Sequence, residues 1–401
     1  MTTSFSQFDG PRLMRRDELI DSIRLSRLCF GELVDIDSEE EYGANYVHPR
    51  RGGTYVLAHE GQLISQIGIF HDQIKMYDGT IRTGSIGGVC THPDYRKQGL
   101  ASHLLEHCAA QLVKEGARLM LISGDNGVYM RLGNVFQGKY MYFSIKPEQG
   151  KQWQSTSADI QLRRATDADA HLCSQLYQAE AVHFVRRQAD FFRALHDPGS
   201  NLYIHADQWI IERSGQAVAY LLLGIPWHLQ SDPGTGVRQV GEYAGSRSAL
   251  VDAIPVLMNI GSSINDLIWP VAWQDVELIQ HLHERSHNGS MASLEGHTLR
   301  IINFPAFMND LRPILRARLD QKLLRGLRFE QKGPVLGGIG DDRYVIVRGS
   351  DRLELDGAAM TLLVMGNANS ASQAVHAPGA LAEVISALFP LPSFLPGLNY
   401  H

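Results

Sequence analysis

The segment from Gly88 to Ala101 constrains this chain more than any other, because it joins a predicted β-strand to a helix through a loop suited to an anion. It reads G-V-C-T-H-P-D-Y-R-K-Q-G-L-A, and an apolar helical pattern continues from Leu104 to Leu112. The start of a helix carries about half a positive charge and several unpaired N–H groups. Gly99 lets the backbone approach an anion, while a neighbouring arginine and lysine add positive charge. The segment therefore predicts a pyrophosphate site.

The residues of this region and its glycines have three other interpretations. An ordinary turn between a strand and a helix is the simplest. A dinucleotide-binding loop is disfavoured because G-x-G-x-x-G is absent, and Gly338-Ile339-Gly340 indicates only a turn between late strands. His103, Glu106 and His107 match an inverted zinc-peptidase pattern, but no third ligand is evident. We therefore predict no metal.

Two motifs in the same third of the chain resemble those of a known superfamily. R-x-x-G-x-A at Arg96 to Ala101 resembles the coenzyme A loop of the GNAT N-acetyltransferases, and V-x-T-x-P at Val89 to Pro93 is typical of the strand before it. V-Y-M-R-L-G at Val128 to Gly133 resembles the Y-x-x-L-G helix that ends the family's core. Asn134 departs from the family, which usually has Phe there. The resemblance implies a mixed central sheet flanked by helices, with acetyl-CoA as co-substrate.

The resemblance also implies roles for particular residues. The backbone N–H of Val89 would polarise the thioester carbonyl as an oxyanion-type donor. Tyr129 would protonate the departing thiolate, at a cost of about 2 kcal/mol for a phenol of ordinary pKa; a core aromatic is the alternative for this residue. The positions expected to contact acetyl-CoA are Val89, Cys90, Thr91, Arg96, Lys97, Gln98, Gly99, Leu100, Ala101 and Ser102.

A faint internal repeat divides the first 300 residues. At 401 residues the chain is long enough for two or three domains. Tyr55 to Phe70 and Trp209 to Gly224 both read as hairpins with glycine at the turn. Each follows a predicted helix, Arg16 to Phe30 in the first case and Asp167 to Ala179 in the second. These features favour duplication, although any two α/β domains can share hairpins.

The remainder of the chain differs in kind. Polar stretches at 146–159 and at His287 to Gly296 are typical of linkers. From about His297 the pattern predicts a strand, T-L-R-I-I-N-F, and then a helix that Pro305 could start. Further strands and a last helix complete a small α+β domain, at Tyr344 to Val347, Arg352 to Leu355, Met360 to Met365 and Ala380 to Phe389.

The whole chain is similar to the enhanced-intracellular-survival (Eis) type of acetyltransferase. This implies an active GNAT domain at 1–150, a degenerate GNAT-like domain at 151–295 and a sterol-carrier-like domain at 296–401. It further implies trimers or hexamers, and a catalytic base supplied by the α-carboxylate of His401. The proline-rich end, F-L-P-G-L-N-Y-H, favours a fixed tail. If the tail is disordered instead, a side chain or water must be the base.

Charge and composition bear on the partners. The net charge of -6 and the absence of an obvious Lys/Arg cluster disfavour nucleic acid and favour a cationic acceptor such as an aminoglycoside, a polyamine or a lysine side chain. An acidic run could line the acceptor groove or could be a solvated loop; it includes Asp35, Asp37, Glu39 and Glu40. Four widely spaced cysteines and no apolar run of membrane length indicate a cytoplasmic protein.

Two further expectations concern the later segments. Gly241 to Arg247, G-E-Y-A-G-S-R, lies where the repeat would place a second cofactor loop. It lacks the R-x-x-G-x-A spacing, so we expect no coenzyme A there. The lipid-carrier resemblance of the last segment leaves a second class of function open, in which the protein carries a lipid or acyl-CoA without turnover.

Overall fold

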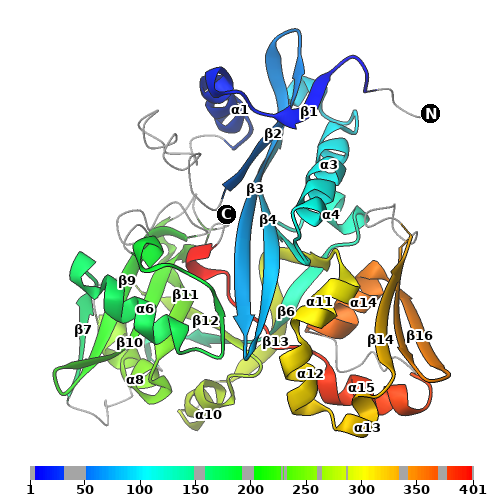
Figure 1. Ribbon diagram of the computed structural model, residues 1–401. Coiled ribbons are helices and arrows are strands. Elements are labelled where there is room, and N and C mark those ends of the chain that lie inside the picture. The colour runs from blue at the N-terminus through cyan, green and yellow to red at the C-terminus, as the bar shows by residue number, and fades with distance from the viewer. Residues whose placement is uncertain are drawn as a thin grey trace.

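One large mixed sheet forms the centre of the molecule. The computed structural model describes residues 5–30, 51–148, 159–191, 203–226, 229, 233–259, 264–285, 288–333, 342–368 and 377–399. Within these ranges thirteen strands form the sheet, in the order β1-β2-β3-β4-β5-β13-β6-β12-β11-β10-β9-β7, and β8 pairs with β3. Helices flank both halves of the sheet, and a separate three-stranded sheet lies to one side (Figure 1).

The first half of the sheet carries the predicted loop and its helix. Its strands are β1 (Asp9–Leu13), β2 (Arg51–His59), β3 (Gln62–Met76), β4 (Gly79–Thr91) and β5 (Leu119–Ser123). Its helices are α1 (Leu19–Phe30), α3 (Leu100–Lys114) and α4 (Gly127–Arg131). Helix α3 forms where predicted because its apolar side chains recur at helical spacing and are buried against the sheet, at Leu100, Leu104, Leu105, Cys108 and Leu112.

The second half follows a similar plan. Its strands are β7 (Ile160–Arg164), β8 (Val182–Phe184), β9 (Tyr203–Arg213), β10 (Gln216–Pro226), β11 (Val237–Gly245) and β12 (Asp266–Ala272). Its helices are α6 (Ala170–Gln178), α8 (Arg247–Asp252), α9 (Ile254–Asn259) and α10 (Val276–Glu284). The hairpins β2-β3 and β9-β10 confirm the predicted ones. Both turn on two residues of positive φ, Glu60-Gly61 and Ser214-Gly215.

The two halves repeat one partly buried ion pair as well as their strand order. Arg12 donates to both carboxylate oxygens of Glu18 at 2.8 and 2.7 Å. Arg163 does the same to Asp169, at 2.8 Å for both bonds. In each case the acid lies six residues after the arginine and accepts a backbone N–H at the start of the following helical segment. The faint sequence repeat therefore has a detailed structural counterpart.

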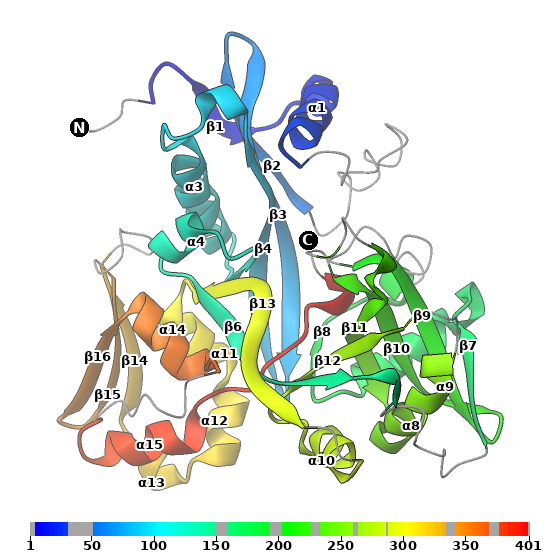
Figure 2. The same cartoon turned by 180° about the vertical axis from the view of Figure 1, so that it is seen from behind.

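Two long strands join the halves. β6 (Val135–Ile145) pairs with β12 and β13, while β13 (Gly289–Ile301) pairs with β5 and β6, so both cross the middle of the molecule (Figure 2). The expected linker at His287 to Gly296 is therefore wrong from Gly289 onward. The strand expected to open the last domain belongs to the large sheet, because its buried Leu299 and Ile301 face the shared core.

The last part packs helices on its own small sheet. It contains α11 (Phe304–Asp310), α12 (Arg312–Arg318), α13 (Gln321–Leu324), β14 (Leu327–Lys332), β15 (Arg343–Arg348), β16 (Asp351–Asp356), α14 (Gly357–Met365) and α15 (Ala380–Leu388). The predicted strand at Met360 to Met365 is wrong, since these residues belong to α14. The Asp356 side chain caps that helix by accepting the N–H of Ala359 at 2.8 Å, a signal that a continuous apolar run obscures.

Candidate functional site

Strands β4 and β5 part from each other where the predicted loop begins. Their parallel pairing ends at Ile86 and Ile122, whereas β4 continues to Thr91. Beyond Ile86 the β3-β4 register shifts, and Gly88 has a φ of 62°, which marks a bulge in β4. The Thr91 carbonyl points away from β3 and accepts a hydrogen bond from Arg96 Nε at 3.1 Å. The end of β4 therefore presents backbone groups that β5 does not pair.

The loop after β4 has the backbone geometry of an anion-binding concavity. Lys97 and Gly99 both lie in the left-handed region, with φ of 63° and 83°, and α3 begins at Leu100. Alternation of ordinary and left-handed residues turns successive N–H groups toward one side. The N–H groups of the first turn of α3 have no partner within the helix. An added Cβ at Gly99 would meet only Phe5, at 3.6 Å, so backbone conformation and not crowding calls for glycine there.

Cys29 lies beside this loop, and sequence reasoning missed it. The thiol at the end of α1 contacts the Thr91 carbonyl at 3.4 Å. A hydrogen bond from Cys90 and then the guanidinium of Arg96 lower the pKa of Cys29 to about 6, against the opposing effect of burial. Cys90, which is buried, has its pKa raised well above the ordinary value by the same hydrogen bond. No sequence signal links Cys29 to the loop, since more than sixty residues separate it from Arg96.

Tyr129 lies on α4, just beyond the end of β5, and its ring is 7% exposed. Burial raises the pKa of Tyr129 to about 12, and the charges of Asp125 and Cys90 add to this. Against a free thiol near 8.5, a phenol of this pKa donates its proton at a cost of roughly 5 kcal/mol. Burial of Tyr129 therefore makes this proton transfer more costly than the value of about 2 kcal/mol for a phenol of ordinary pKa.

The chain end is buried as far as the structure describes it. Leu398 is 5% exposed and Asn399 is 2% exposed. Upstream, the Phe394 carbonyl accepts hydrogen bonds from Tyr140 Oη at 2.5 Å and Gln137 Nε2 at 2.7 Å. His401 itself lies outside the described residues, as do Asp35, Asp37, Glu39 and Glu40. The roles assigned to them stay predictions.

The second half of the sheet contains the counterpart of this site, and it is occupied by the protein itself. β11 and β12 pair only from Val237 to Gln239, although β11 continues to Gly245. Glu180 Oε1 accepts the Gly245 N–H at 2.9 Å, and Arg247 donates to both oxygens of Glu180 at 2.8 and 2.6 Å. Glu180 lies eleven residues after Asp169, as Cys29 does after Glu18. A carboxylate thus stands where the first half has a thiol.

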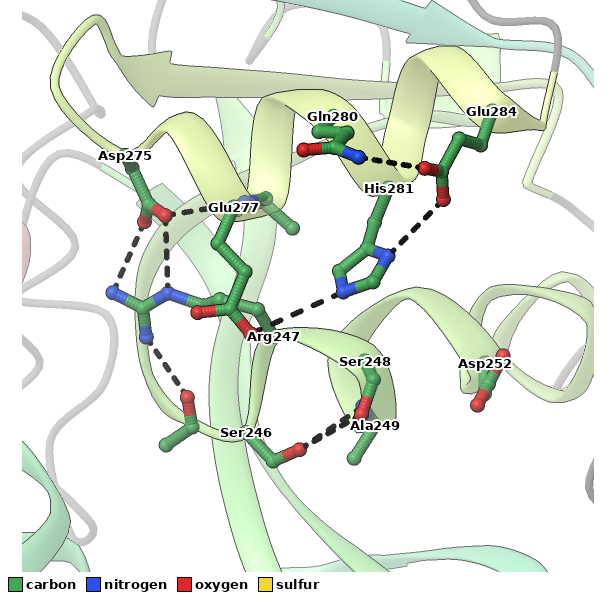
Figure 3. A network of polar contacts seen from close by, with 12 residues as sticks. Ser246, Arg247, Ser248, Ala249, Asp252, Asp275, Glu277, Gln280, His281 and Glu284 are labelled. Atoms are coloured by element: carbon green, nitrogen blue, oxygen red, sulfur yellow. Dashed lines mark hydrogen bonds and ion pairs between the residues drawn. The ribbon is translucent and has the colours of Figure 1, made fainter.

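Asp275 completes the ion cluster of this second opening. Arg247 Nε donates to Asp275 at 3.2 Å (Figure 3). The hydroxyl of Tyr243 donates to the same carboxylate at 3.1 Å. The Ser246 side chain accepts the Ala249 N–H and so caps α8. A cavity of about 600 Å³ remains beside these groups. Arg247 and the Ala249 N–H at the start of α8 are already hydrogen-bonded by internal groups.

The histidines of α3 serve packing in the structure. His103 stacks on Phe5 with ring centroids 4.2 Å apart, and the ring centroids of His107 and Tyr55 lie 5.2 Å apart. Among the described residues, no group of three or more His, Cys, Asp or Glu side chains is placed to hold a metal ion. Within the same ranges, no helix combines the length and apolar character needed to cross a membrane.

A comparison with protein families gives one match in the first third of the chain. Residues 11–134 match the model of the acetyltransferase (GNAT) domain, and the parted strands, the loop and α4 all lie within this stretch. No curated protein matches the sequence significantly.

Solved structures match the fold over nearly the whole chain. A probable N-acyltransferase from Enterococcus faecalis V583 is 15% identical with a TM-score of 0.66, covering 95% of this chain and 97% of its own. A GCN5-related N-acetyltransferase from Kribbella flavida is 16% identical with a TM-score of 0.66, covering 96% and 97%. Eis1 from Mycobacterium abscessus is 13% identical with a TM-score of 0.60, covering 94% and 96%. At these identities the likeness shows a shared fold.

Proposed function

We propose that this chain is an acetyl-CoA-dependent N-acetyltransferase that moves an acetyl group directly to a primary amine of a cationic acceptor. The observation that carries the proposal is the end of β4, where unpaired backbone, two left-handed loop residues and the start of α3 converge. This arrangement suits a pyrophosphate followed by an extended chain bearing amides. It lies within the stretch that matches the GNAT domain.

Different groups of the protein would carry the separate steps of acetyl transfer. The loop from Arg96 to Ser102 would hold the pyrophosphate, and Val89 N–H, next to the bulge, would stabilise the oxyanion of the tetrahedral intermediate. Tyr129 would donate a proton to the departing thiolate. The α-carboxylate of His401 would accept the proton of the attacking amine. The acceptor is an aminoglycoside, a polyamine or a lysine side chain, which the net charge of -6 would attract.

The wider assignment follows the Eis-like plan. The second half of the sheet would be a degenerate GNAT-like domain without coenzyme A, and the last part a sterol-carrier-like domain. Support comes from the repeated Arg–acid pair and from the overall likeness to Eis1 of Mycobacterium abscessus. We further propose a cytoplasmic trimer or hexamer, which light scattering on the purified protein would test.

A coenzyme A release assay tests the activity. The wild-type protein should release coenzyme A from acetyl-CoA in the presence of a polyamine, an aminoglycoside or a lysine peptide. Arg96→Glu should abolish turnover, because it places an anion beside the pyrophosphate. Lys114→Glu is the matched control: it reverses a charge at the other end of α3 and should keep activity within about twofold. Absence of turnover with every acceptor class would refute the proposal.

A second candidate function rests on a groove in the last part of the chain. A cavity of about 470 Å³ between α11, α12 and β14 has an apolar floor that includes Leu315 and Phe329, and Arg312, Arg316 and Arg328 line it. The segment from Arg312 to Lys332 contains seven basic and two acidic residues. The expectation of no Lys/Arg cluster is therefore wrong for this segment. An anionic amphiphile would suit such a groove. Extraction and mass spectrometry of the purified protein would detect a carried lipid.

A further inference from the structure

Two cysteines from separate parts of the chain meet beside the loop after β4. Cys29 is the next-to-last residue of α1, and Cys90 is the next-to-last residue of β4. Cys90 is a buried member of an apolar cluster with Leu25 and Leu63, and Cys29 packs against the same cluster. The two thiols are hydrogen-bonded to each other. The fold therefore brings them together as a pair.

The two thiols of this pair have different surroundings. Cys29 Sγ lies 3.4 Å from the Thr91 carbonyl oxygen, and Arg96 Nε lies 3.1 Å from the same oxygen. One oxygen thus brings the thiol and a guanidinium close together, and a nearby cation favours a thiolate. The hydrogen bond from Cys90 and then Arg96 lower the pKa of Cys29 to about 6. Cys90 keeps its proton, because that hydrogen bond and burial raise its pKa.

This asymmetry matches the two roles in the oxidation of a thiol pair. The attacking sulfur must be a thiolate that a small oxidant can reach, and Cys29 is partly exposed. The second sulfur needs only to be adjacent, and Cys90 is 5% exposed, so another chain cannot reach it. A disulfide is about 2 Å long, so thiols in hydrogen-bond contact need to approach by only about 1 to 2 Å. Cys29 lies at a helix end, where the backbone adjusts most easily.

We propose that Cys29 and Cys90 are a redox pair that hydrogen peroxide oxidises to an internal disulfide, which makes them a covalent modification site beside the candidate cofactor loop. The Cys29 thiolate attacks one peroxide oxygen, the O–O bond breaks, and the departing hydroxide takes a proton from solvent to become water. This step leaves a sulfenic acid on Cys29.

The second step closes the disulfide. The sulfur of Cys90 attacks the sulfenic sulfur of Cys29, so that an S–S bond forms and the S–O bond breaks. The departing hydroxide takes the proton of the Cys90 thiol and leaves as the second water. In total the two thiols lose two electrons, and one hydrogen peroxide is reduced to two waters.

The other two cysteines lack these features and serve as controls. Cys108 on α3 and Cys173 on α6 are both 0% exposed. Burial raises the pKa of Cys173 to about 12, and it raises the pKa of Cys108 as well. Neither is a thiolate that peroxide can reach, so we expect both to stay reduced.

Peptide mapping after peroxide treatment tests the proposal. The full-length protein is treated with hydrogen peroxide, its remaining thiols are blocked, and it is digested with trypsin without reductant. Cys29 lies in the tryptic peptide 28–50, and Cys90 lies in the peptide 83–96. The wild type should release these two peptides as one cross-linked species, which dithiothreitol separates.

Three variants assign the role of each sulfur. Cys90→Ser should stop at the sulfenic acid of Cys29, which dimedone traps. Cys29→Ser should give no cross-link and should lose free thiols at least tenfold more slowly than the wild type. Cys173→Ala, the matched control, should form the cross-link at a rate within about twofold of the wild type.

Three results would overturn the proposal. The first is a wild type that keeps both thiols under peroxide, and the second is a wild type in which the sulfenic acid of Cys29 accumulates without loss of the Cys90 thiol. The third is a disulfide that joins two chains, seen as a covalent dimer on a non-reducing gel. Every readout follows thiol chemistry, so it is independent of whether the protein transfers acetyl groups.

Discussion

The two halves of the large sheet part their central strands in the same way but fill the opening differently. In the first half, β4 ends on a loop of left-handed residues and an uncapped helix start, with the Cys29 thiol nearby. In the second half, the Glu180 carboxylate takes the Gly245 N–H and Arg247, and Ser246 caps the helix. One opening leaves its donors for an external anion, and the other satisfies them internally. The difference between the two openings rests on a few side chains, namely Glu180, Arg247 and Ser246.

The largest effect should come from breaking the internal anion site. Arg247→Gln leaves the carboxylates of Glu180 and Asp275 without their shared cation, and all three side chains are less than 20% exposed. Removing one partner of such a buried pair costs about 3 to 5 kcal/mol. Urea unfolding should show this loss, while the matched Arg96→Gln, at an exposed position, should change the free energy of unfolding by less than about 0.5 kcal/mol. Equal stabilities would contradict the contrast between the two openings.

For acetyl-CoA binding, the two arginines should exchange their importance: Arg96 should matter and Arg247 should not. Arg96→Glu should weaken acetyl-CoA binding about 100-fold, or roughly 2.7 kcal/mol, because a carboxylate then repels the pyrophosphate. Calorimetry on a second variant, Arg247→Lys, should give a Kd within about twofold of wild type. A similar loss of affinity in both variants would show that the two openings do not differ as described.

The Cys29 thiol should react at unusually low pH. Because its pKa is lowered to about 6, the thiolate is present above pH 6 and is lost as the pH falls through that value. The rate of iodoacetamide modification should reach half of its plateau near pH 6. Arg96→Ala should move this midpoint upward, since the guanidinium favours the thiolate. A wild-type midpoint above pH 8 would remove the electrostatic link between α1 and the loop.

The smallest effect should come from removing the Glu180 carboxylate from the opening between β11 and β12. Glu180→Ala removes the acceptor of the Gly245 N–H and one of the two carboxylates bound to Arg247, so inorganic sulfate should bind the variant and raise its melting temperature by about 2 °C at tens of millimolar. The wild-type protein should show a smaller rise under the same salt, with sodium chloride at equal ionic strength as the reference. No difference between the two proteins would mean that Glu180 does not occupy an anion position.

Local signals in the sequence account for much of this fold. Gly99 after a strand and before an apolar helix predicted the loop, and glycine at both hairpin turns predicted the repeated strands. The prediction failed where a segment's neighbours decide its state. Gly289 to Gly296 looks polar, yet it belongs to a strand because β6 offers it pairing partners. Pairing between distant segments leaves little trace in a single sequence.

The same distinction applies to the functional site: consecutive residues were predicted from the sequence, and residues that meet only in the fold were not. The loop from Arg96 to Ser102 was visible because its chemistry is carried by consecutive residues. Cys29 was not, because its partners lie on separate elements and meet only in the folded chain. The pKa of Tyr129 depends on its burial, which the motif alone does not report.

The stoichiometry of acetyl-CoA binding tests the central contrast most directly. Isothermal titration of the full-length chain should give one site per chain, and Arg96→Glu should weaken that site about 100-fold. Two sites per chain, or a single site that survives Arg96→Glu and disappears in Arg247→Lys, would contradict the assignment of the open anion site to the loop after β4.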